Sequence, residues 1–179
     1  LRCASFANGE PIPNVTDSTS WTQLNSGAWC NYNNDSTYDE VYGKLYNWYT
    51  TVDPRGLCPA GWHVPNNAEW NTLIGFLDPA YIPDGLIQSQ TAGGKMKSTG
   101  VQYWLSPNGA ATNESGFSGL PGGSNNQGFY DIGKYADFGS SSESSANTFH
   151  CRSLWWVSGS VESYIRSKEN GVSIRCVKD

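Results

Sequence analysis

The segment from Pro65 to Pro79 places the firmest constraint on the fold, because it carries a complete set of signals for one helix. Asn66 can cap the N-terminus, and Glu69 three residues later supplies the reciprocal partner of a capping box. Apolar residues then recur with helical spacing and share one face; they are Trp70, Leu73, Ile74 and Leu77. Because proline disfavours helical geometry in the residue before it, the helix is expected over about 66–77, ending near Asp78.

Glycine, asparagine and proline punctuate the rest of the chain, so other elements are expected to be short. Residues 1–40 indicate an N-terminal strand and long loops. The β-branched and aromatic residues of 41–52 predict a core strand that ends at 53–56. Between 80 and 137 only short elements fit, around Lys95–Lys97, Tyr103–Leu105 and Phe129–Ile132.

The C-terminal part of the chain predicts strands. Thr148–Leu154 and Ser160–Arg166 have strand composition and flank a turn. Val172, Ile174 and Cys176 alternate with other residues, so they are expected to form the inward face of a last strand.

Length and composition indicate one aromatic-rich domain over residues 1–179. A chain of 179 residues can bury most of its apolar surface in one core. It holds 8 Trp, 10 Tyr and 6 Phe, more large rings than such a core needs. Exposed Trp and Tyr are typical of recognition surfaces.

The charge pattern excludes some partners. A net charge of -5 with only 11 Lys and Arg offers no basic surface for phosphates, so nucleic acid is not expected as a partner. No apolar run approaches the roughly 18 residues of a membrane span. The residues Leu1-Arg2-Cys3 open the sequence without a signal-peptide pattern, and we expect an export signal upstream.

Several motifs carry a resemblance to a known family. They lie at 57–70 (LCPAGWHVPNNAEW), 171–177 (GVSIRCV), 42–49 (YGKLYNWY), 92–98 (AGGKMKS) and 111–123 (ATNESGFSGLPGG). Together they resemble the Fibrobacter succinogenes major paralogous domain, over nearly the whole chain. The resemblance implies an α+β, C-type lectin-like fold, with a twisted antiparallel sheet, one or two helices and a high loop content. It also implies a relation in fold to formylglycine-generating enzymes, whose cysteine site these positions do not reproduce.

Five cysteines permit at most two internal disulfides. By analogy with the bridge of lectin-like domains, the resemblance implies that Cys58 pairs with Cys176. Cys151 is the candidate for a free thiol, and the partners of Cys3 and Cys30 stay open. The family's link to bacterial surface proteins implies an oxidising compartment. The expected location is extracellular or at the bacterial cell surface, where a lipid anchor could hold the protein, and a phage tail is the alternative.

The resemblance also suggests where a ligand binds. Some relatives are variable proteins of diversity-generating retroelements, in which a reverse transcriptase rewrites adenines in the codons of a C-terminal segment. Mapped onto residues 137–166, that pattern implies a recognition face for a protein or other macromolecule on a target surface. The expected ligand-binding residues are Asp137, Gly139, His150, Arg152, Trp155, Trp156, Glu162, Tyr164 and Arg166.

Tryptophans within residues 137–166 and tryptophans in the family motifs lead to different expectations. Because neighbours on a strand point to opposite faces, at least one of Trp155 and Trp156 should face away from the core unless they lie in a loop. The alternative is that both pack in the core. Four motif tryptophans are expected inside, namely Trp48, Trp62, Trp70 and Trp104, and His63 is expected to be a structural histidine.

Catalytic and metal sites are weakly supported, and no catalytic residue, cofactor or metal is expected. The glycine-rich stretch before Met96 lacks the Ser or Thr of a phosphate loop, and the residues around Ser118 miss the serine-nucleophile pattern. Oxygens near Asp35 and Asp39 miss the spacing of a calcium loop. Two alternatives to a binding domain remain: an enzyme using Cys151 beside His150, or a structural domain of a surface or phage-tail assembly.

Overall fold

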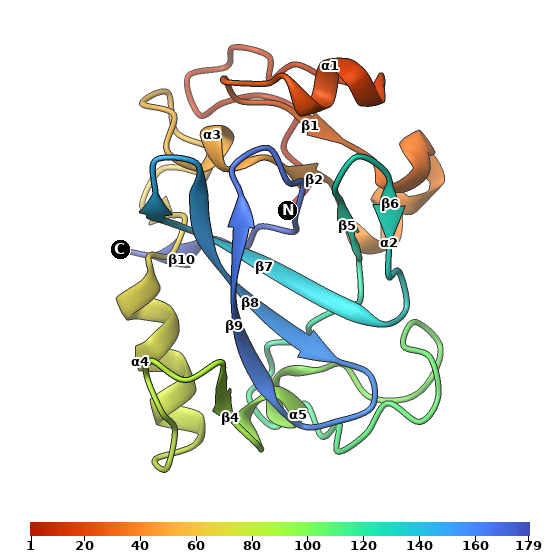
Figure 1. Ribbon diagram of the computed structural model, residues 1–179, viewed down its shortest axis with the longest axis vertical. Coiled ribbons are helices and arrows are strands. Elements are labelled where there is room, and N and C mark those ends of the chain that lie inside the picture. The colour runs from red at the N-terminus through yellow and green to blue at the C-terminus, as the bar shows by residue number, and fades with distance from the viewer.

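The computed structural model describes residues 1–179 and shows an α+β fold in which antiparallel strands predominate (Figure 1). The helices are α1 (Ser18–Thr22), α2 (Asp39–Tyr42), α3 (Trp48–Thr51), α4 (Asn67–Leu77) and α5 (Ala92–Met96). The strands are β1 (Trp29–Cys30), β2 (Leu45–Tyr46), β3 (Trp62–His63), β4 (Ile87–Ser89), β5 (Ser124–Asn125), β6 (Phe129–Tyr130), β7 (Tyr135–Ser145), β8 (Thr148–Trp155), β9 (Val161–Ser167) and β10 (Val177–Lys178). Long irregular stretches connect them, as the density of glycine and asparagine predicts.

Helix α4 forms as its local signals predict. The Asn66 side chain accepts from the backbone N–H groups of Ala68 and Glu69, and the Glu69 carboxylate accepts from the N–H of Asn66. Trp70, Ile74 and Leu77 are its buried residues. The helix is thus fixed at its first turn by hydrogen bonds and along its length by one apolar face.

The prediction of one core strand over residues 41–52 is wrong. This stretch contains the end of α2, the two-residue strand β2 and the short helix α3. Gly43 has φ +77, which ends α2, and the Asn47 side chain caps α3 by accepting from Thr50 N–H. The element expected near Lys95 is the end of helix α5, and Tyr103–Leu105 has no regular structure.

The central sheet has the strand order β4–β9–β8–β7 and all its pairs are antiparallel. Both strands expected over 148–154 and 160–166 are confirmed as β8 and β9. The final segment differs from expectation: Val172 and Ile174 are buried, but Val172 pairs only through an isolated bridge and Ile174 has no strand partner. The regular strand β10 follows them and pairs with β3.

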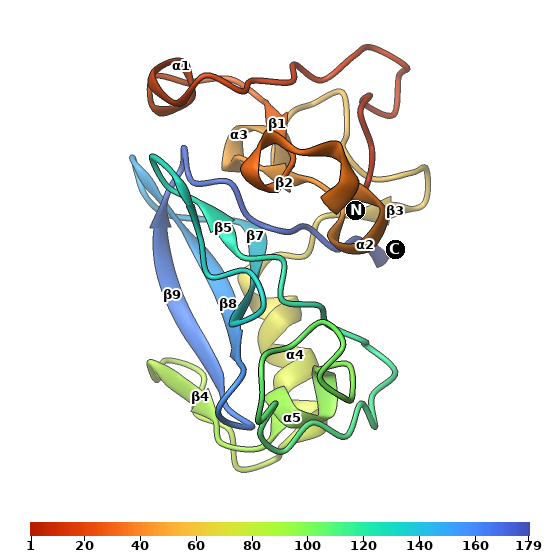
Figure 2. The same cartoon turned by 90° about the vertical axis from the view of Figure 1, so that its right-hand side faces the viewer.

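The two faces of this sheet have different coverings. Directly paired residues share a face, and Ala136, Phe138 and Leu154 pack against Trp70 and Ile74 of α4. We call this the covered face. Figures 1 and 2 show α4 on this side and no helix in front of β8 and β9 on the other side.

The opposite face is covered only at one end. There Phe149 and Cys151 pack with Val172 and Ile174. We call the remainder the open face; its residues are Tyr135, Asp137, Ser153, Trp155, Glu162, Tyr164 and Arg166.

The disulfide expected between Cys58 and Cys176 is confirmed, with a Cα–Cα distance of 5.9 Å. Cys3, Cys30 and Cys151 are free, so the chain has one bridge. Cys151 is unpaired as expected, but it is fully buried, and that burial raises the pKa of its thiol. It belongs to the core and not to an exposed variable surface.

The motif tryptophans divide between core and surface. Trp70 and Trp104 are buried as expected, and Trp48 is half-buried. The expectation for Trp62 is wrong, because its side chain is 46% exposed. It lies on the two-residue strand β3, at the edge where that strand pairs with β10 near the end of the chain.

Candidate recognition face

An aromatic cluster occupies one end of the open face. The rings of Tyr135 and Trp155 stack with centroids 5.6 Å apart and planes 21° from parallel. Trp156 meets both edge-on, at 5.9 Å from Tyr135 and 5.6 Å from Trp155. Trp155 belongs to the open face, whereas Trp156 also packs against the core cluster around Trp70. The expectation that at least one of the two tryptophans faces away from the core is therefore confirmed.

Polar side chains of β9 continue the open face. Tyr164 Oη donates to Glu162 Oε2 at 2.6 Å, and this bond raises the pKa of Tyr164 to about 12. The Arg166 guanidinium carbon lies 5.1 Å from the centre of the Tyr164 ring, within the range of a cation–π contact. Glu162, Tyr164 and Arg166 thus form a row in which Tyr164 contacts both of the others.

Asp137 holds the Arg166 end of this row. It is 2% exposed, accepts from Arg166 Nη2 at 3.0 Å, and accepts also from Ser153 Oγ. Burial raises the pKa of Asp137, and the Arg166 charge opposes that shift. Two donors above it, Arg166 Nε and Trp155 Nε1, have no acceptor. Because both atoms are buried, they are unsatisfied donors inside the face and not contact points at its surface.

The Lys97 ammonium fixes the turn that carries the two tryptophans. Lys97 is fully buried, and its Nζ donates to the carbonyls of Gly109, Trp155 and Ser158, each at 2.8 Å. Burial lowers the pKa of Lys97 to about 8. An ammonium has three N–H donors, so all of them are satisfied and the turn after β8 is held in place.

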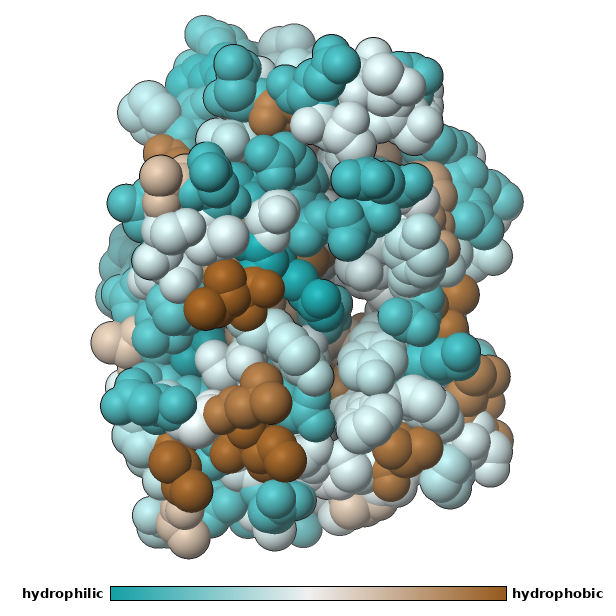
Figure 3. Space-filling model, viewed as in Figure 1, coloured by the Kyte–Doolittle hydropathy of each residue, from teal (hydrophilic) through white to brown (hydrophobic).

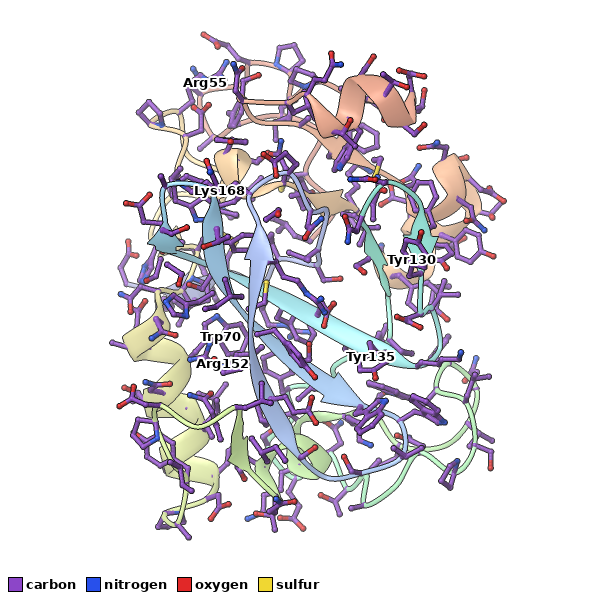
Figure 4. All side chains as sticks on the ribbon, viewed as in Figure 1. Arg55, Trp70, Tyr130, Tyr135, Arg152 and Lys168 are labelled. Atoms are coloured by element: carbon purple, nitrogen blue, oxygen red, sulfur yellow. A yellow bond between two sulfur atoms is a disulfide. The ribbon has the colours of Figure 1, made fainter.

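A shallow hollow of about 130 Å³ adjoins Arg166 beside the hairpin of β5 and β6. Tyr130 and Asp131 are among the residues that line it, and Tyr130 is 52% exposed. Figure 4 shows Tyr130 and Tyr135 on the side of the molecule away from α4. The hollow extends the candidate surface from the sheet onto a neighbouring hairpin.

Three of the nine expected ligand-binding residues lie elsewhere. Arg152 is fully buried on the covered face, where its Nη2 donates to Asn67 and Asn71 of α4; Figure 4 places it on the same side as Trp70. His150 is half-buried on that face, and burial lowers its pKa. The expectation of an exposed side chain at Arg152 is wrong, because strand alternation turns it toward the helix.

Gly139 also lies outside the open surface. A Cβ atom there would approach Ile174 to 2.8 Å and Val172 to 2.9 Å, so any larger residue would collide with these packed side chains. The other six expected residues converge; they are Asp137, Trp155, Trp156, Glu162, Tyr164 and Arg166. Within this group Asp137 and Glu162 are themselves buried, so they position their half-buried neighbours.

Sequence reasoning missed Tyr135, Ser153 and Lys97. Tyr135 and Ser153 could have been found from strand alternation, since Tyr135 lies two residues before Asp137 and Ser153 two before Trp155. Lys97 gave a weaker signal, a lysine in a glycine-rich apolar motif. Its role depends on three carbonyls from distant segments, which no local pattern reveals.

The residues considered for other chemistry are not brought together into one site. His150 and Cys151 are neighbours on β8 and point to opposite faces. Asp35 Oδ1 accepts from Thr37, and Asp39 Oδ2 pairs with Lys44. The structure contains no group of three or more His, Cys, Asp or Glu side chains placed to hold a metal ion.

The fold and this surface define an α+β domain that presents aromatic and polar side chains on the open face of an antiparallel sheet. The chain belongs to the Fibrobacter succinogenes major domain family, whose model matches residues 1–178. No curated protein and no solved structure matches it. None of its helices has the length and apolar character that crossing a membrane requires.

Proposed function

We propose that this domain is a non-enzymatic, surface-exposed binding module that recognises a protein or other macromolecule on a target surface through its open face. The observation that carries the proposal is the convergence of Trp155, Trp156, Tyr164 and Arg166 on one side of the central sheet, next to Tyr135. Trp, Tyr and Arg dominate binding hot spots because they combine large contact area with directional bonds.

Rigidity of the surface supports the same proposal. The side chains at the centre of the face are already fixed by stacking, by the Tyr164–Glu162 bond and by Asp137. A preorganised surface loses little conformational entropy on binding. Hydrophobic residues on the side shown in Figure 3 form separate small patches among hydrophilic ones.

Diversification by a retroelement is part of the proposal. Half-buried positions such as Trp155 and Tyr164 can change without touching the core, while Cys151 and Arg152 on the same sheet cannot. The disulfide between Cys58 and Cys176 is compatible with an extracellular location. A lipid-anchored protein and a phage-tail protein would both present the face in this way.

The test is binding to arrays of immobilised proteins and glycans by the wild-type domain and two double variants. Trp155→Ala with Tyr164→Ala removes two aromatic side chains of the open face. His150→Ala with Ile165→Ala is the matched control on the other side of β8 and β9. We expect the control to keep every interaction of the wild type and the open-face variant to lose them. Retention of binding by the open-face variant, or an array without any bound ligand, contradicts the proposal.

A further inference from the structure

A mainly apolar cavity lies between the start of α4 and the C-terminal segment, away from the open face. Its volume is about 240 Å³. Its apolar walls are formed by Pro65, Trp70, Leu73, Phe117 and Val177, and the charged residues that line it are Glu69 and Arg175. The cavity is large enough for a small molecule, since an apolar cavity of roughly 150 Å³ holds benzene.

Two polar groups on this cavity lack partners. Trp70 is 2% exposed, yet its indole Nε1–H has no acceptor. Arg175 forms neither an ion pair nor a hydrogen bond, and its guanidinium carbon lies 4.2 Å from the centre of the Phe117 ring. An unpaired buried donor costs stability, and a guanidinium stacked on a ring stays free to bind a carboxylate in its own plane.

The acidic residue on the cavity does not satisfy either group. Glu69 Oε1 bonds to His63 Nε2 at 2.7 Å, and Glu69 Oε2 accepts from Asn66 N–H at 2.9 Å. Both carboxylate oxygens are thus engaged at the helix cap. The charge without a protein partner belongs to Arg175, an exposed residue that lines the cavity, and it is positive, which favours an anionic ligand group.

We propose that this cavity binds a small carboxylate with a compact aryl body. The ring of the ligand would lie among Trp70, Leu73 and Phe117, and its carboxylate would pair with Arg175. The site is independent of the open face, because none of its lining residues belongs to that face.

The experiment is a titration of ¹⁵N-labelled protein with 3-phenylpropionate, followed by the indole N–H resonances. The Trp70 signal is assigned from its loss in Trp70→Phe. We expect the Trp70 resonance to shift on binding, and Arg175→Gln to weaken the affinity by about tenfold, the loss of one charge-assisted bond. Lys178→Gln is the control for a general change of charge and should bind as the wild type does.

A neutral analogue tests the charge without any variant. The wild type should bind 3-phenylpropanol about tenfold more weakly than the acid, and Trp155→Ala should bind the acid normally. The proposal is overturned if the Trp70 resonance does not move at about 10 mM acid, a concentration above the dissociation constant of a specific site. It is equally overturned if acid and alcohol bind alike, or if the shifts occur on the open face.

Discussion

Replacement of Lys97 by methionine should destabilise the domain, because it removes the ammonium and keeps the length of the side chain. The Trp155 carbonyl also accepts from Ser158 N–H at 3.4 Å, whereas the carbonyls of Gly109 and Ser158 have no other donor. Each buried acceptor left unsatisfied costs about 1–3 kcal/mol. Relief from burying a charge offsets part of that cost, so we expect a loss of about 2–5 kcal/mol in the free energy of unfolding.

Guanidinium chloride unfolding of the variant and the wild type measures this loss. Lys95→Met is the matched control, since Lys95 is only half-buried and donates to one carbonyl, that of Leu77, at 2.9 Å. Its cost should stay below about 1 kcal/mol. If both variants unfold at the same denaturant concentration, the Lys97 ammonium does not hold the turn that carries Trp155 and Trp156.

Further expectations concern individual residues. Trp70→Ala should cost about 3–5 kcal/mol by opening a core cavity, and Trp62→Ala less than about 1 kcal/mol, both measured by chemical unfolding; equal losses would refute the burial assignments. The two histidines should titrate on opposite sides of pH 6.5 in NMR spectra: carboxylates on both ring nitrogens raise the pKa of His63, and burial lowers that of His150. Because the pKa of His63 is raised in the folded state, its contribution to stability is complete below pH 6.5 and is lost as the pH rises through the folded-state pKa. Cys151 should resist iodoacetamide in the native protein and react after unfolding; rapid labelling of native protein would show that β8 is not packed as described.

Local signals in the sequence were sufficient for α4, because its cap and its apolar face lie within one short segment. The same reasoning failed for residues 41–52. The aromatic and β-branched residues there favour a strand, but the Asn47 side chain caps a helix at Trp48–Thr51 and also accepts from Ala28 N–H. A contact from a distant part of the chain therefore overrides the local preference.

The candidate site could be predicted only in part for a similar reason. Strand alternation separates Arg152 from Ser153 and Trp155, but it does not say which side of the strand faces the helix. Arg152 looks like a surface residue by composition, yet Asn67 and Asn71 bind it inside. Trp62 shows the converse, an aromatic residue in a recognised motif that the structure leaves exposed.

The central claim is that the open face is the recognition surface and that its residues are diversified. The most direct test is to sequence the codons for residues 135–166 across a population that carries this gene, together with the surrounding DNA. The account predicts a neighbouring reverse transcriptase gene, an adenine-rich template copy, and amino-acid variation concentrated at Trp155, Trp156, Tyr164 and Arg166, with Cys151 constant. Variation spread equally over buried and open positions, or an invariant segment without a template copy, would contradict it.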